Sequence, residues 1–105
     1  MDVLLRIKRL VLQGRVRFTD KARDEMESDE LDPVEVVESI LNAQTIDKTL
    51  RSRSARRRHP REKLYVIKSF SFSGTLIYTK GAIVSQQEDE VFYIFISAKI
   101  PTIEG

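Results

Sequence analysis

The chain has 105 residues and a mass of 12.2 kDa, 41% of its residues are hydrophobic, and its formal net charge is +2. It has no cysteine and one histidine, which excludes a disulfide framework and a cysteine-based zinc site, so neither a metal nor a cofactor is expected. No run approaches the roughly 18 apolar residues of a membrane span, so a cytoplasmic protein with no membrane partner is expected.

Three helices are expected in the first part of what should be a single domain over residues 1–105. Residues 2–12 carry an apolar stripe at helical spacing. Thr19 is a suitable N-cap for a short helix over about 20–29. The third helix should cover about 33–42, because Asp32 is a suitable N-cap with proline at the first helical position and glutamate at the third.

The pattern changes to β-strands after this helical part. Residues 64–72, 75–85 and 91–98 are rich in β-branched and aromatic residues and are separated by turn signals, and a weaker strand is expected at 45–50. The fold class predicted is α+β, with two to three N-terminal helices packed on a C-terminal antiparallel sheet of three to four strands.

Charge is distributed unevenly along the chain. Residues 20–38 contain nine acids and two bases, whereas residues 48–68 contain nine bases and one acid. Within the second range, "RSRSARRRHPREK" at 51–63 is the basic stretch, which is either a solvated loop or a phosphate-binding loop. As a phosphate-binding loop it supplies most of the candidate RNA-binding residues, which are Arg51, Arg53, Arg56, Arg57, Arg58, Arg61 and, just beyond it, Lys68.

The residue types available restrict the possible chemistry. The glycines do not fit a phosphate-binding loop, and His59 lies in the basic stretch, where it is poorly placed to activate a serine. RNA cleavage remains feasible, because the substrate's own 2′-OH is the nucleophile. The protein then needs only a base, cations for the phosphate and an acid for the leaving oxygen, which lysine, arginine and tyrosine supply.

Two segments carry a resemblance to known families. "IKRLVLQGRVRFTDKA" resembles the opening of the MqsR toxins, which belong to the RelE-type superfamily of ribonuclease toxins. "FTDKARDEMESDELDPVEVVESILNA" resembles small uncharacterised domains that open with a Phe-Thr-x-His-Ala pattern and finish on a strand similar to "ISAKIP". Together the resemblances cover about 6–101 and imply a RelE-like fold with metal-independent cleavage of mRNA.

The resemblance also implies a catalytic set and partners. Lys48 matches the first lysine of the MqsR-like set, Tyr78 its tyrosine and Lys99 its final lysine, whereas its glutamine has no match. Lys80 is a further candidate, because residues two apart on a strand project from the same face. The implied partners are mRNA and a cognate antitoxin, in a type II toxin–antitoxin pair, with a homodimer or a toxin–antitoxin hetero-oligomer as the assembly.

Two other functions stay open from the sequence. One is a non-catalytic RNA-binding module that uses the basic stretch. The other is a protein-interaction domain in which the arginines bind an acidic partner.

Overall fold

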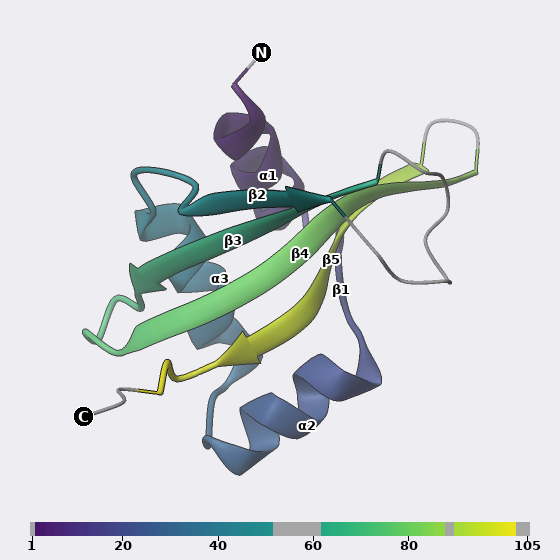
Figure 1. The fold of residues 1–105 in the computed structure, drawn as a ribbon. Helices are drawn as coiled ribbons and strands as arrows, with labels where there is room; N and C mark the ends of the chain where they lie inside the picture. The colour runs from purple at the N-terminus through teal and green to yellow at the C-terminus, as the bar shows by residue number, and fades with distance from the viewer. Residues whose placement is uncertain (1, 52–61, 88–89, 103–105) are drawn as a thin grey trace.

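The computed structural model describes residues 2–51, 62–87 and 90–102. Its helices and strands, shown in Figure 1, are α1 (Val3–Leu12), β1 (Val16–Phe18), α2 (Asp20–Ser28), α3 (Pro33–Asn42), β2 (Lys48–Arg51), β3 (Lys63–Phe70), β4 (Leu76–Gln87) and β5 (Glu90–Lys99). The predicted α+β class is confirmed, as are the three N-terminal helices. No helix among the described residues is long and apolar enough to cross a membrane.

The sheet differs from the predicted antiparallel sheet of three to four strands. It has five strands in the order β1-β5-β4-β3-β2, and β1 runs parallel to β5 while the other pairs are antiparallel. β1 is only three residues long, so it shows no usable alternation, and its partner strand lies near the other end of the sequence. Phe18 anchors it by stacking on Phe95, with ring centroids 4.9 Å apart.

The helix termini follow from local sequence. The Thr19 hydroxyl accepts a hydrogen bond from the backbone N–H of Ala22 at 3.1 Å, and Asp32 begins α3 with a complete capping box. At the other end of α3, the ammonium of Lys8 donates to the carbonyl of Ala43 at 2.6 Å. This bond joins α1 to the C-terminal end of α3, where the carbonyls favour a cation.

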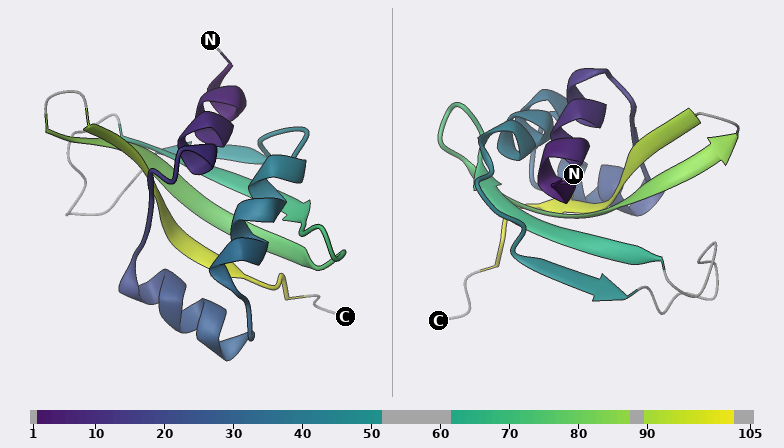
Figure 2. Two further views of the ribbon diagram at one scale, coloured as in Figure 1. Left: turned by 180° about the vertical axis from the view of Figure 1, so that it is seen from behind. Right: turned by 90° about the horizontal axis from the view of Figure 1, so that it is seen from above.

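Helices α1 and α3 cover one face of the sheet, as the view from behind shows (Figure 2). The hydrophobic core lies between these helices and the sheet, and it includes Ile7, Ile40, Ile67, Ile77 and Phe95. Side chains alternate along a strand, so the residues between the core positions project from the opposite face of the sheet. This face is turned toward the viewer in Figure 1, and we call it the open face. Its members include Lys48, Val66, Lys68, Phe70, Leu76, Tyr78, Lys80, Ser97 and Lys99.

A β-bulge in β5 fixes which residues reach the open face. Lys80 pairs with Ser97 but its neighbour Gly81 pairs with Phe95, so Ile96 is the extra residue. After the bulge the alternation of β5 is reversed, which places Ser97 opposite Lys80. On the core side, the buried ring of Tyr93 packs directly on Gly81.

Candidate functional site

Three of the predicted residues form a row across the open face. Tyr78 of β4 pairs with Lys68 of β3 on one side and with Lys99 of β5 on the other. The Nζ atom of Lys99 lies 5.5 Å from the centre of the Tyr78 ring, within the range of a cation–π contact. A half-buried tyrosine is therefore flanked by two lysines.

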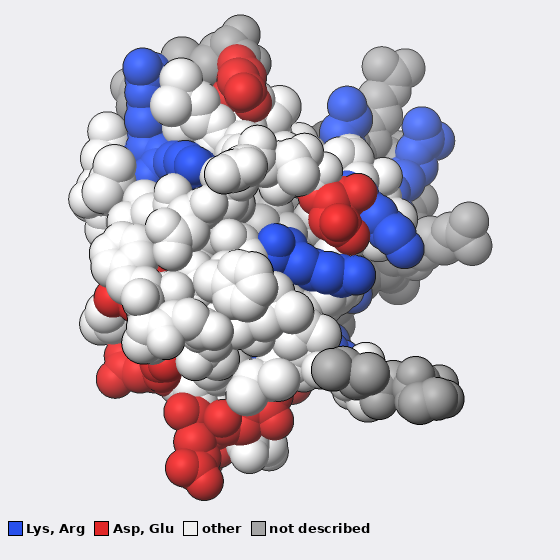
Figure 3. Space-filling view, turned by 90° about the vertical axis from the view of Figure 1, so that its left-hand side faces the viewer, with Lys and Arg blue, Asp and Glu red and all other residues white. Residues whose placement is uncertain are grey.

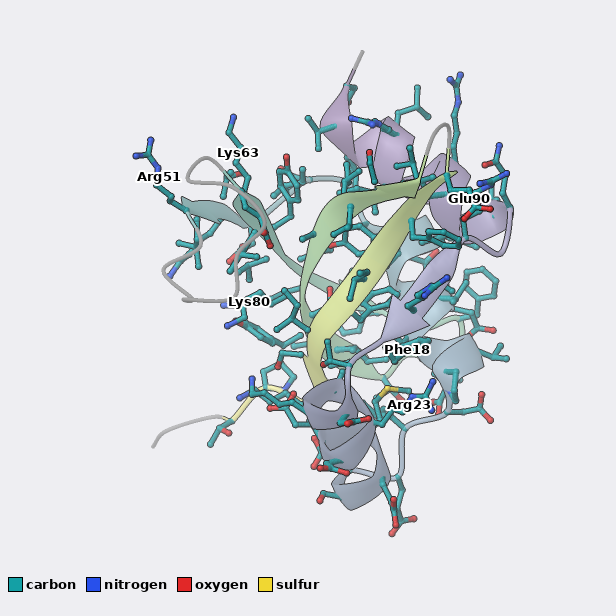
Figure 4. The ribbon with its side chains drawn as sticks, turned by 90° about the vertical axis from the view of Figure 1, so that its right-hand side faces the viewer. Phe18, Arg23, Arg51, Lys63, Lys80 and Glu90 are labelled. Atoms are coloured by element: carbon teal, nitrogen blue, oxygen red, sulfur yellow. The ribbon has the colours of Figure 1, made fainter. Side chains whose placement is uncertain are left out.

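Lys80 and Lys48 lie in the next row of the open face. Val66 of β3 pairs with Lys80 of β4 on one side and with Lys48 of β2 on the other. Two strand spacings separate the backbones of the two lysines, which is about 10 Å. Lys80 is two residues from Tyr78 on the same face, and Figure 4 shows it projecting away from the sheet. The structure therefore brings Tyr78, Lys80 and Lys99 together and places Lys48 further away.

Two carboxylates flank the first row. The carboxylate of Asp47 lies 3.6 Å from Nζ of Lys68, and that of Glu25 lies 3.8 Å from Nζ of Lys99. Both lysine side chains are more than 40% exposed, so these pairs stabilise the fold little. In contrast, neither Lys48 nor Lys80 forms an ion pair with any residue that the structure describes. Both are therefore available to a ligand without displacing a carboxylate among the described residues, whereas a ligand at Lys68 or Lys99 would compete with an exposed ion pair.

Glu25 is the residue of the site that the sequence did not reveal. Its Oε1 atom accepts a hydrogen bond from the hydroxyl of Ser97 at 2.6 Å and another from the backbone N–H of Ala98 at 3.2 Å. Burial raises the pKa of Glu25, but the hydrogen bond from Ser97 and the nearby lysines outweigh it, so the pKa is lowered from its ordinary value of 4.5. Nothing in the acid-rich segment 20–38 distinguishes Glu25 from its neighbours.

Side chains of α2 and of its two cap residues, Thr19 and Asp29, also close the edge of β5 beyond the end of β1. The Thr19 hydroxyl donates to the carbonyl of Ile96 at 3.2 Å. Further along, Glu25 accepts from the backbone of β5, and Asp29 accepts from the N–H of Ile100 at 2.8 Å. One turn of helix separates Glu25 from Asp29, so both side chains reach the same strand edge.

Glu25→Gln is expected to make the melting temperature depend less on pH in the acid range. A carboxyl group whose pKa is lowered by folding stabilises the protein above its unfolded pKa, and this stabilisation is lost as the pH falls through the folded pKa. Wild-type protein should therefore lose stability as the pH falls below 4.5, and Glu25→Gln should lose less, as measured by melting temperature against pH. Glu27→Gln, on the exposed side of α2, is the control, and an identical profile for Glu25→Gln and wild type would contradict the expectation.

A shallow pocket lies beyond Lys99. It has a volume of about 290 Å³ and is lined by Asp24, Glu25, Ser28, Asp29, Lys99, Ile100 and Thr102. Its carboxylates repel phosphate, so a polyanion would reach Lys99 from the Tyr78 side. Among the residues that the structure describes, no group of three or more histidines and acids is arranged to hold a metal ion.

The predicted basic stretch joins β2 to β3. Arg51 and Lys63 pair at the ends of the two strands, and Figure 4 shows them on the same side of the molecule as Lys80. Lys63 is five residues from Lys68 along β3, which is about 17 Å. The remaining candidates lie outside the described residues, and they are Arg53, Arg56, Arg57, Arg58 and Arg61.

No family model, no curated protein and no solved structure matches this chain.

Proposed function

We propose that this protein is a metal-independent endoribonuclease, resembling the MqsR and RelE-type toxins, that cleaves mRNA by 2′-OH attack. The observation that carries the proposal is the row of Lys68, Tyr78 and Lys99, with Lys80 beside it on the same face. It combines a phenolic proton donor with cations on a face that none of the three described helices covers. Those are the groups that phosphodiester cleavage by the 2′-OH requires.

The roles follow from the position of each side chain. The 2′-OH attacks the neighbouring phosphorus, its proton passes to a base, and the 5′-oxygen leaves with a proton from an acid, which yields a 2′,3′-cyclic phosphate. We assign Lys80 as the base, because it has no ion-pair partner among the described residues and lies next to Tyr78. Lys99 supports the charge on the phosphate and Tyr78 is the acid. Lys48, two strands from Lys80, binds a neighbouring phosphate.

Cleavage of RNA by purified protein in EDTA tests this function. The expected products carry a 2′,3′-cyclic phosphate, or its hydrolysis product, at one end and a 5′-OH at the other. Products with a 3′-OH and a 5′-phosphate would contradict the mechanism. Salt-sensitive RNA binding without cleavage would instead support the non-catalytic RNA-binding module.

A cytoplasmic toxin of this kind needs a cognate antitoxin, and this partner belongs to the same proposal. It predicts a short neighbouring reading frame whose product forms a complex with this protein and suppresses cleavage.

A further inference from the structure

The β3–β4 hairpin exposes large apolar side chains at its turn. Phe70 is 54% exposed, Phe72 is 64% exposed and Leu76 is 38% exposed. Figure 3 looks at the end of the molecule where this hairpin turns, and the surface there is largely uncharged, with acidic side chains gathered below it. Exposed aromatic residues gathered at one place mark an interaction surface more often than scattered ones do. We call Phe70, Phe72 and Leu76 the hairpin platform.

The backbone beneath the platform is held in place by hydrogen bonds. The N–H of Ser71 donates to the carbonyl of Thr75 at 2.8 Å, and the N–H of Thr75 donates to the hydroxyl of Ser71 at 3.0 Å. Helix α3 adds two more bonds.

The carboxylate of Glu38 accepts from the N–H of Phe72 at 3.1 Å, and the amide of Asn42 donates to the carbonyl of Phe70 at 2.8 Å. The backbone of the turn is therefore held in place before any ligand arrives, which removes the backbone part of the entropic cost of binding at these rings.

The platform continues into the candidate active site. Phe70 and Leu76 pair across the hairpin on the open face, and the next pair on that face is Lys68 with Tyr78. Residues two apart on a strand are separated by about 7 Å, so an aromatic ring and a lysine follow one another along β3. On β4 the order is Leu76, Tyr78 and Lys80.

We propose that the hairpin platform binds unpaired bases of single-stranded RNA by stacking, next to the site of cleavage. The inference rests on the proposed function and names its substrate class. A single strand presents bases and phosphates in alternation, and the open face places a ring next to a lysine on each of two strands, Phe70 beside Lys68 on β3 and Tyr78 beside Lys80 on β4. Every base has a π-face, so stacking on Phe70 and Phe72 contributes affinity without strict sequence choice. The lysines favour this occupant over an apolar protein segment, because they supply cations beside the rings.

Binding of a fluorescent oligonucleotide tests the platform independently of cleavage. The probe is a short single-stranded 2′-O-methyl RNA, which lacks the nucleophile and cannot be cleaved by the proposed reaction. Phe70→Ala and Phe72→Ala are each expected to weaken binding of the probe about tenfold, which is the loss of one stacked base. Phe70→Trp keeps an aromatic ring at this position and should bind the probe as tightly as wild type. Leu12→Ala is the control, since Leu12 is 70% exposed on α1 and lies outside the platform. Binding of the same sequence as a duplex should depend little on either phenylalanine.

The outcomes separate the platform from the proposed function. Weakened binding of the phenylalanine variants together with no cleavage by wild type would support the platform and overturn the ribonuclease. If wild type cleaves RNA and both phenylalanine variants bind the 2′-O-methyl probe as tightly as wild type, the platform is overturned and the ribonuclease stands. The platform is also overturned if wild type does not bind the probe. If the phenylalanine changes instead abolish self-association in sedimentation experiments, with RNA binding unchanged, the platform is a protein interface and the inference is wrong.

Discussion

Lys80→Ala is expected to lower the rate of RNA cleavage about 10²- to 10⁴-fold, the usual contribution of a general acid or base. Tyr78→Phe, which removes only the proton donor, should fall in the same range. Lys48→Ala should instead weaken binding and leave the rate at saturating protein nearly unchanged, because Lys48 lies two strands from Lys80. Single-turnover cleavage at increasing protein concentration separates the two effects.

Lys63→Ala is the matched control for these lysine variants. Lys63 is exposed and lies at the far end of β3 from Tyr78, so its removal should reduce affinity alone. The assignment of the base would be wrong if Lys80→Ala kept the full rate while Lys48→Ala lost it. In that case the base would lie nearer β2, and the scissile phosphate would lie over Val66.

Gly81→Ala is expected to destabilise the fold by about 3 kcal/mol or more, which is the upper range for overpacking a core. A Cβ atom at residue 81 would lie 2.5 Å from Cζ of Tyr93 and 2.6 Å from its hydroxyl oxygen. The ring is fully buried and lies 5.1 Å from that of Phe95 in a T-shaped contact, so it has little room to move. Denaturant unfolding monitored by circular dichroism measures the loss.

Tyr93→Phe and a double variant test the cause of this loss. The buried hydroxyl of Tyr93 has no hydrogen-bond partner among the described residues, so Tyr93→Phe should be as stable as wild type or more so. Gly81→Ala combined with Tyr93→Leu should be more stable than the sum of the single changes predicts, because the shorter side chain vacates the contact. A Gly81→Ala protein with wild-type stability would show that the close approach does not constrain the strand.

The helices were predictable because their signals are local. Asp32 and Thr19 start helices through hydrogen bonds to residues two or three positions away, which a sequence displays directly. β1 was not predictable, since its stability comes from pairing with β5 and from the stacking of Phe18 on Phe95. The five-stranded mixed sheet therefore became visible only in the structure.

The candidate site, like the fold, was predictable only where local patterns place its residues. Alternation along β4 placed Lys80 beside Tyr78, and the structure confirms that both lie on one face. Pairing of Lys99 with Tyr78 depends on the bulge at Ile96, which no local pattern indicated. Glu25 was hidden for a related reason, because its role depends on how α2 packs against β5.

The closure of the β5 edge by α2 bears on how the protein behaves at high concentration. The side chains of α2 cover the part of β5 that β1 leaves unpaired, and at the opposite side of the sheet the edge strand is β2, where another copy could add a strand. β2 has four residues, all exposed, and begins and ends with Lys48 and Arg51. Two such edges approaching each other bring like charges together, which opposes the sheet-to-sheet growth that leads to fibrils.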